Sequence, residues 1–228
     1  MTVYEYTNKG SREENQDYVC HGSLPDGSGI YIVADGMGGY SDGAIASKVV
    51  AESILDYIIS NFDNATPALL LKEAISFAND ALMLKRLAMA AKKMGCVITI
   101  LLIVDGYAHI SWLGDSRIYM FREGKEVYRT EDHSVINELA KLKTLSASSL
   151  EKYASVVTKS IMGDELVDNA PLAKIEIDKG DVFILCTDGF HKEIDMNKAL
   201  TYEDTQKNEL DALSDNISDN YSFIKVVI

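Results

Sequence analysis

The chain has 228 residues, a length that suits one domain or two small ones, and 47% of them are hydrophobic, which is typical of a globular protein. Its net charge of −13 argues against nucleic-acid binders and anionic-membrane binders, because both need a surplus of positive charge. The three cysteines, Cys20, Cys96 and Cys186, follow neither a disulfide framework nor a zinc-type spacing, so we expect reduced thiols. The start does not resemble a signal peptide, and no run of roughly 18 apolar residues occurs, so we expect a soluble, cytoplasmic protein.

Apolar runs rich in β-branched and aromatic residues predict the strands of the fold. They cover residues 29–34, 96–104, 107–113, 117–121, 126–129, 181–187 and 221–228, and a short strand begins near Tyr18. Asp105-Gly106 and Glu123-Gly124 each stand between two consecutive strands. Such pairs favour tight two-residue turns, so we expect two β-hairpins.

Periodic apolar positions predict helices over residues 43–60, 67–93 and about 133–143. In the first helix four side chains fall near one face: Ile45, Val49, Ile54 and Ile58. The Ser-rich residues 145–149 predict a mobile surface loop. Hairpins with helices inserted in pairs indicate an α+β fold of antiparallel sheets covered by helices, with no domain boundary in residues 1–228.

Carboxylates stand at the ends of several predicted strands. Asp35 and Asp188 each follow an apolar run and precede a glycine, although Asp-Gly is first of all a turn dipeptide. Asp115 follows residues 107–113, Asp219 precedes the last strand, and Asp17 precedes the strand near Tyr18. Oxygen ligands without clustered His or Cys fit Mg²⁺ or Mn²⁺ better than Zn²⁺.

Arg12 stands five residues before Asp17. A guanidinium beside a carboxylate-rich metal site is suited to bind a phosphate group. The alternative is an exposed ion pair of Arg12 with Glu13 or Glu14.

Six motifs follow one another along the chain: R-E-E-N-Q-D (12–17), V-A-D-G-M-G-G (33–39), L-G-D-S-R (113–117), E-D-H-S (131–134), C-T-D-G-F (186–190) and D-N-Y-S (219–222). Together they resemble the metal-dependent type-2C serine/threonine protein phosphatases, and the Met after Asp35-Gly36 resembles the bacterial branch. The resemblance covers nearly the whole chain. It implies a single catalytic domain over residues 1–228, built as a β-sandwich of two antiparallel sheets flanked by pairs of helices.

By position, the resemblance implies a site for two Mn²⁺ or Mg²⁺ ions. Asp35 would bridge both ions, and Gly36 would offer its backbone carbonyl to one of them. Asp188 and Asp219 would hold the second ion, and Asp17 would act mainly through a metal-bound water.

The resemblance also implies the reaction. A water or hydroxide that bridges the two ions would hydrolyse phosphoserine and phosphothreonine in proteins, with Arg12, Asp17 and Asp35 as the catalytic residues and Arg12 on the substrate phosphate. Asp115, with help from Asp188, would match the ligand of a weaker third ion.

Two assignments stay open in the sequence. Met37 stands where many eukaryotic relatives have a His proposed as general acid, so the proton donor is either a metal-bound water or His133. His133 also fits a purely structural turn. Near the C-terminus Asp215 and Asp219 both precede Asn, and we choose Asp219 as the metal ligand because a hydroxyl residue and an apolar strand follow it directly.

Other functions of the same fold remain as alternatives to an active, broad phosphatase. One is a catalytically inactive regulator, although all the expected metal aspartates are present. Another is an enzyme devoted to one phosphoprotein. We expect a monomer that acts on phosphoproteins, such as a serine/threonine kinase or its targets, and residues 141–170 would set substrate choice.

Overall fold

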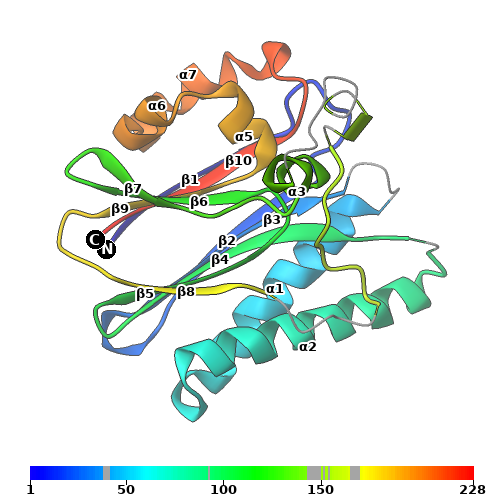
Figure 1. Ribbon diagram of the computed structural model, residues 1–228, viewed down its shortest axis with the longest axis horizontal. Helices are drawn as coiled ribbons and strands as arrows, with labels where there is room; N and C mark the ends of the chain where they lie inside the picture. The colour runs from blue at the N-terminus through cyan, green and yellow to red at the C-terminus, as the bar shows by residue number, and fades with distance from the viewer. Residues whose placement is uncertain (38–41, 92, 143–149, 151, 154, 165–169) are drawn as a thin grey trace.

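The computed structural model describes residues 1–37, 42–91, 93–142, 150, 152–153, 155–164 and 170–228. Gly38 and Gly39 of the motif at 33–39 lie outside the described residues, as do the Ser-rich residues 145–149 and part of the segment 141–170. Labels of helices and strands follow Figure 1.

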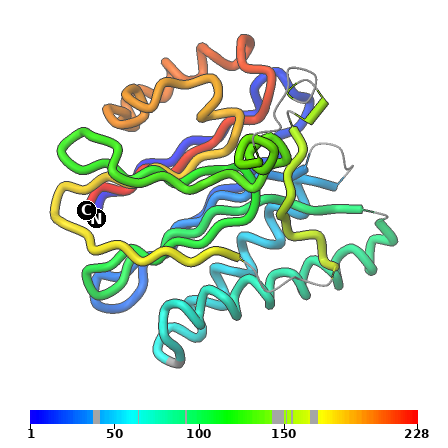
Figure 2. The backbone as a smooth tube through the Cα atoms, in the orientation of Figure 1, coloured from blue at the N-terminus to red at the C-terminus, as the bar shows by residue number. Residues whose placement is uncertain are grey.

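Two five-stranded antiparallel sheets form the centre of the molecule (Figure 1). The first has the order β1 (Thr2–Asn8), β10 (Tyr221–Val227), β9 (Val182–Cys186), β6 (Arg117–Arg122) and β7 (Lys125–Arg129). The second has the order β2 (Asp17–Ser23), β3 (Gly29–Gly36), β4 (Cys96–Val104), β5 (Tyr107–Leu113) and β8 (Leu172–Glu176). Because β1 pairs with β10, the two ends of the chain lie side by side (Figure 2).

Helices cover the outer face of each sheet, so the molecule has four layers (Figure 1). The long helices α1 (Gly43–Asn61) and α2 (Pro67–Ala88) lie on the second sheet, and the short helices α5 (Asp188–Glu193), α6 (Met196–Thr201) and α7 (Lys207–Asp211) lie on the first. Another short helix, α3 (Val135–Lys141), lies beside the sandwich. This arrangement confirms the predicted α+β sandwich. None of the described helices is long and apolar enough to cross a lipid bilayer.

Apolar side chains from both sheets meet in the middle of the sandwich. Val33, Leu101 and Trp112 of the second sheet pack with Phe183 and Ile224 of the first. Each fully buried side chain of this size stabilises the fold by about 1.5–3 kcal/mol. Strand β4 is buried along its whole length, because the other sheet covers one face and α1 with α2 cover the other.

Both predicted hairpins are confirmed. In the β4–β5 turn Asp105 and Gly106 have φ angles of 52° and 75°, and in the β6–β7 turn Glu123 and Gly124 have φ angles of 51° and 73°. Two successive positive φ values are typical of the type I′ turn, whose twist matches that of the flanking strands.

Two predictions about the long helices are wrong in detail. Helix α2 ends at Ala88 rather than at residue 93, because Ala90 takes a φ of 51° and the Ala91 N–H returns to the Arg86 carbonyl at 3.1 Å. Ile45 and Val49 are only partly buried on α1. The buried face of α1 consists of Gly43, Ala46, Ser47, Val50, Ala51, Ile54 and Ile58.

Candidate active site

Asp17 and Asp35 are directly opposite each other on neighbouring strands. Residue Asp17 of β2 pairs in register with Asp35 of β3, so both side chains project from the same face of the sheet. Strand β3 runs two residues beyond the predicted end because Asp35 and Gly36 pair with Val97 and Cys96 of β4. Like charges that face each other in this way destabilise a sheet unless a cation lies between them.

Asp17 is buried beside Asp35, does not itself line the cleft described below, and links the two sheets. Its Oδ2 accepts a hydrogen bond from the Thr187 hydroxyl at 3.0 Å, and Thr187 precedes α5 on the far side of the sandwich. Its Oδ1 is buried without a hydrogen-bond partner in the described part of the chain. An unpartnered buried carboxylate oxygen is costly, so this atom is suited to bind a cation or a cation-bound water.

Asp188 and Asp219 come together because the start of α5 packs tightly against the residues before β10. A side chain at Gly189 would collide with the backbone carbonyl of Asn220, so only glycine permits this approach. The Asn220 amide in turn holds the N-terminal loop: its Nδ2 donates to the carbonyls of Lys9 and Glu14, at 2.8 and 2.9 Å. These contacts explain why Asn follows Asp219.

Arg12 lies on the loop that Asn220 holds, and its guanidinium reaches the Asp219 carboxylate. The Nη2–Oδ2 distance is 3.0 Å, and both side chains are about half exposed. Neither Glu13 nor Glu14 forms an ion pair with Arg12 among the described residues. Asp215 lies in an exposed 3₁₀ turn and does not line the site, so the structure brings Asp219 to the other carboxylates and leaves Asp215 outside.

Asp115 lies in the turn between β5 and β6, and side-chain contacts of His133 stabilise this turn. His133 accepts a hydrogen bond at Nδ1 from the Gly114 N–H at 3.3 Å and stacks on Trp112. Burial lowers the pKa of His133 to about 4, so its ring is neutral at pH 7. His133 does not line the cleft, which favours the structural reading of this residue over the general acid.

Another residue of the E-D-H-S motif, Asp132, also stabilises the turn that carries Asp115. It accepts two hydrogen bonds from Arg117, both at 2.7 Å, and Arg117 belongs to the L-G-D-S-R motif. His191 of α5 contacts the Asp115 backbone carbonyl through Nε2 at 3.0 Å. Burial lowers the pKa of His191 to about 4, so the neutral ring donates Nε2–H to this carbonyl.

An open cleft of about 1180 Å³ exposes most of these groups to solvent. Arg12, Asp35, Gly36, Asp115, Asp188 and Asp219 all line it. Met37 and Val97 contribute apolar surface, and the described part of the segment 141–170 adds Ser155, Val156, Val157, Ser160 and Met162. The cleft thus has a carboxylate-rich floor and a mixed wall.

The clustering of carboxylates changes their acidity. Burial, opposed in part by hydrogen bonds and assisted by the charges of Asp188 and Asp219, raises the pKa of Asp17 to about 7. Burial and then the charge of Asp17 raise the pKa of Asp35 well above its usual value. Burial and Asp188 raise the pKa of Asp115 to about 6. Ionised carboxylates are therefore unfavourable here without a cation.

The donor set fits hard divalent cations. Carboxylate oxygens and the Gly36 carbonyl are the ligand types that Mg²⁺ and Mn²⁺ prefer. Among the described residues, no group of three or more His, Cys, Asp or Glu side chains has a geometry that could hold a metal ion without rearrangement. Two of the carboxylates contact side-chain cations instead, Asp219 with Arg12 and Asp188 with Lys192.

Comparison with known proteins identifies the family. The family model described as protein phosphatase 2C matches residues 7–220. The chain belongs to this family. The protein phosphatase PhpP of Streptococcus pneumoniae is 30% identical over 184 residues, which cover 78% of this chain and 74% of PhpP. This member of the protein phosphatase 2C family is therefore a protein-serine/threonine phosphatase, a hydrolase of the bacterial type.

Solved structures show the same fold. The S. agalactiae serine/threonine phosphatase has a TM-score of 0.82 and 25% identity, with 100% of this chain and 99% of that one covered. The catalytic domain of the phosphatase PstP in complex with two manganese ions has a TM-score of 0.80 and 22% identity, with 98% and 96% covered. At 22% identity the likeness to PstP concerns the fold alone.

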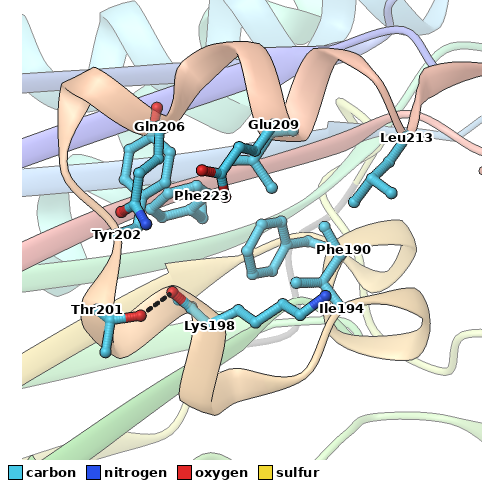
Figure 3. Close-up of a pocket in the computed structure, with 11 residues that line it drawn as sticks. Phe190, Ile194, Lys198, Thr201, Tyr202, Gln206, Glu209, Leu213 and Phe223 are labelled. Carbon is cyan, nitrogen blue, oxygen red and sulfur yellow. Dashed lines mark hydrogen bonds between the residues drawn. The ribbon is translucent and has the colours of Figure 1, made fainter.

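A second, smaller pocket lies away from the carboxylates, between helices α5 to α7 and β10 (Figure 3). It has a volume of about 180 Å³. Phe190 and Phe223 form its apolar floor, with ring centroids 4.6 Å apart, while Lys198 and Glu209 stand at its rim. Phe190 belongs to α5, the helix that begins with Asp188, so this pocket adjoins the helix that presents Asp188 to the active site.

Sequence reasoning missed the residues whose contacts surround the site carboxylates and Arg12. They are Thr187, His191, Lys192 and Asn220. A signal existed for Lys192 alone, because it stands four residues after Asp188, one turn along a helix. The contacts of Thr187 and Asn220 join positions more than 150 residues apart, and no local pattern announces them.

Proposed function

We propose that this phosphatase hydrolyses phosphoserine and phosphothreonine in proteins with Arg12, Asp17 and Asp35 as catalytic residues. The facing pair of Asp17 and Asp35, with Asp17 Oδ1 buried and unpartnered, carries the proposal. Such a pair favours a divalent cation, which balances the charge of both carboxylates when they are ionised.

Two Mn²⁺ or Mg²⁺ ions, when bound, supply the Lewis acidity that activates water and offsets the charge of the phosphate. Asp35 and the Gly36 carbonyl are the residues that we assign to the first ion, and Asp35, Asp188 and Asp219 to the second. Asp17 would orient a water from its buried position beside Asp35. The PstP catalytic domain, which has the same fold, binds two manganese ions, and this supports the number and type of ions in the proposal. Asp115 is assigned to a weaker third ion only.

Arg12 is the group that we assign to the substrate phosphate. It lines the cleft beside the metal-binding carboxylates, and its contact with Asp219 orients the guanidinium toward them. A guanidinium offers five N–H donors, so it can contact Asp219 and phosphate oxygens together. Arg12 would hold the ester in line for attack by water.

Protonation of the leaving group falls to water in this proposal. Met37 lines the cleft and has no proton to donate, and the His133 ring is committed to the Gly114 turn. The absence of a covalent phosphoenzyme also leaves Cys186 a structural role, and burial raises the pKa of its thiol.

The test is hydrolysis of p-nitrophenyl phosphate and of a phosphothreonine peptide. We expect turnover with Mn²⁺ or Mg²⁺, none in excess EDTA, and none for Asp35→Asn with metal present. Undiminished turnover in excess chelator would overturn the two-metal mechanism. No turnover under any metal would favour the inactive regulator.

The remaining assignments stay predictions. Phosphoproteins are the proposed substrates, with a serine/threonine kinase or its targets as candidates, and the choice between many substrates and one is open to the same peptide assay with several sequences. A single catalytic domain over residues 1–228, a monomeric state and a cytoplasmic location are likewise proposed.

A further inference from the structure

Lys192 lines the active-site cleft, and among the described residues Arg12 is the other side-chain cation that lines it. It follows Asp188 by four residues on α5, and its Nζ donates a hydrogen bond to Asp188 Oδ2 at 2.6 Å. The side chain of Lys192 is 47% exposed, whereas that of Asp188 is 19% exposed. The ammonium therefore reaches a partly buried carboxylate from the solvent side.

Three carboxylates act on this ammonium. Burial lowers the pKa of Lys192, but the negative charges of Asp188, Asp115 and Asp219 outweigh burial and raise it. Lys192 in turn opposes the rise of the pKa of Asp115. Because His191 holds the Asp115 carbonyl at 3.0 Å, α5 carries both this ammonium and the anchor of Asp115.

We propose that the Lys192 ammonium is a built-in cation that competes with a divalent ion for the Asp115–Asp188 side of the cleft. An ion held by these two carboxylates would meet the positive charge of Nζ and would have to displace it from Asp188 Oδ2. The second oxygen of Asp188 remains compatible with the ion shared with Asp219. Lys192 therefore lowers the affinity for the third ion below the affinity that Asp115 and Asp188 alone would provide.

The experiment is calorimetric titration of the whole chain with Mn²⁺, which counts sites and measures their affinities without turnover. We expect Lys192→Gln to bind the third ion at least about tenfold tighter than the wild type, because a unit charge near a divalent ion is removed. Lys192→Arg keeps the charge and should behave as the wild type does. Lys125→Gln, the same substitution on the exposed strand β7, is the matched control and should change nothing.

The double variant Lys192→Gln with Asp115→Asn should lose the gain, because it lacks the carboxylate for which the ammonium competes. Third-ion affinity that is equal or lower in Lys192→Gln overturns the proposal, as does a gain that survives Asp115→Asn. The half-exposed side chain lets Lys192→Gln fold. Unfolding of both Lys192→Gln and Lys192→Met would reveal a structural role and also overturn it.

This proposal rests on the proposed function. The titration distinguishes a failure of the two-metal site from a failure of the role of Lys192. A wild-type chain that binds no Mn²⁺ overturns the two-metal site, and with it the competitor. Two tight ions in every variant, with an unchanged third, overturn the role of Lys192 alone.

Discussion

Asp215 and Asp219 stand in two identical Asp-Asn pairs, and their surroundings separate them. Asp219 contacts Arg12 in the cleft, and its neighbour Asn220 holds the N-terminal loop. Asp215 is exposed in a 3₁₀ turn. The residue type alone therefore does not identify which aspartate faces the cleft; the position of the backbone does.

We expect Asp219→Ala to abolish turnover and weaken Mn²⁺ binding, because it removes the carboxylate that we assign to the second ion. Asp215→Ala should change stability by no more than about 0.5 kcal/mol and leave turnover intact. Calorimetry with Mn²⁺ and the p-nitrophenyl phosphate assay measure both effects. The reverse pattern would show that Asp215 is the ligand.

At the scale of elements, α5 connects the active site to the apolar layer under α6 and α7. Asp188, His191 and Lys192 face the cleft or its turn, while Phe190 packs into the second pocket against Phe223 (Figure 3). Helix α5 has only six residues, so its position depends on packing rather than on helix propensity.

Phe190→Ala should therefore cost about 3–5 kcal/mol of unfolding free energy and weaken Mn²⁺ binding through Asp188. The matched control is Phe77→Ala on α2, where the ring is 47% exposed and the cost should stay near or below about 1 kcal/mol. Urea unfolding and calorimetry test both variants. Unchanged metal affinity in a folded Phe190→Ala would show that α5 keeps its place without this ring.

At the scale of the whole molecule, the carboxylate cluster links folding to metal and to pH. Folding places Asp17 and Asp35 side by side, buries Asp17 and partly buries Asp35, which raises both pKa values. The folded state then binds more protons than the unfolded state between about pH 4 and pH 7, so stability falls as pH rises through this window. His133 and His191 act oppositely below about pH 6.5, because burial lowers their pKa values to about 4.

We therefore expect the melting temperature of the chelator-treated protein to fall from about pH 6.5 to about pH 7.5, where the raised pKa values of the carboxylates outweigh the histidines, which are at most half protonated in the unfolded chain. With saturating Mn²⁺ the slope should reverse, because protons compete with the ions and deprotonation strengthens binding. Scanning calorimetry at constant ionic strength measures both slopes. A chelator-treated protein whose melting temperature rises over this range would contradict the raised pKa values.

Much of the fold could be predicted because its signals are local. The hairpin turns need Asp-Gly and Glu-Gly pairs with positive φ, and the continuous apolar run of β4 needs cover on both faces. The elements without such signals were missed: β1 and β8 are edge strands with much exposed surface, and α5 to α7 are too short to show a helical period.

The sequence by itself determined which residues are available for chemistry: five aspartates at strand ends, an arginine before the first, and no histidine or cysteine cluster. Only the tertiary structure decided how they meet. The register of β2 on β3 places Asp17 opposite Asp35. The Thr187 hydroxyl donates a hydrogen bond to Asp17, which is 170 positions away in the sequence. One turn of α5 places the Lys192 ammonium in contact with the Asp188 carboxylate. The physical reason is that strand pairing and burial act between segments distant in sequence, whereas turns and apolar periods are fixed by immediate neighbours.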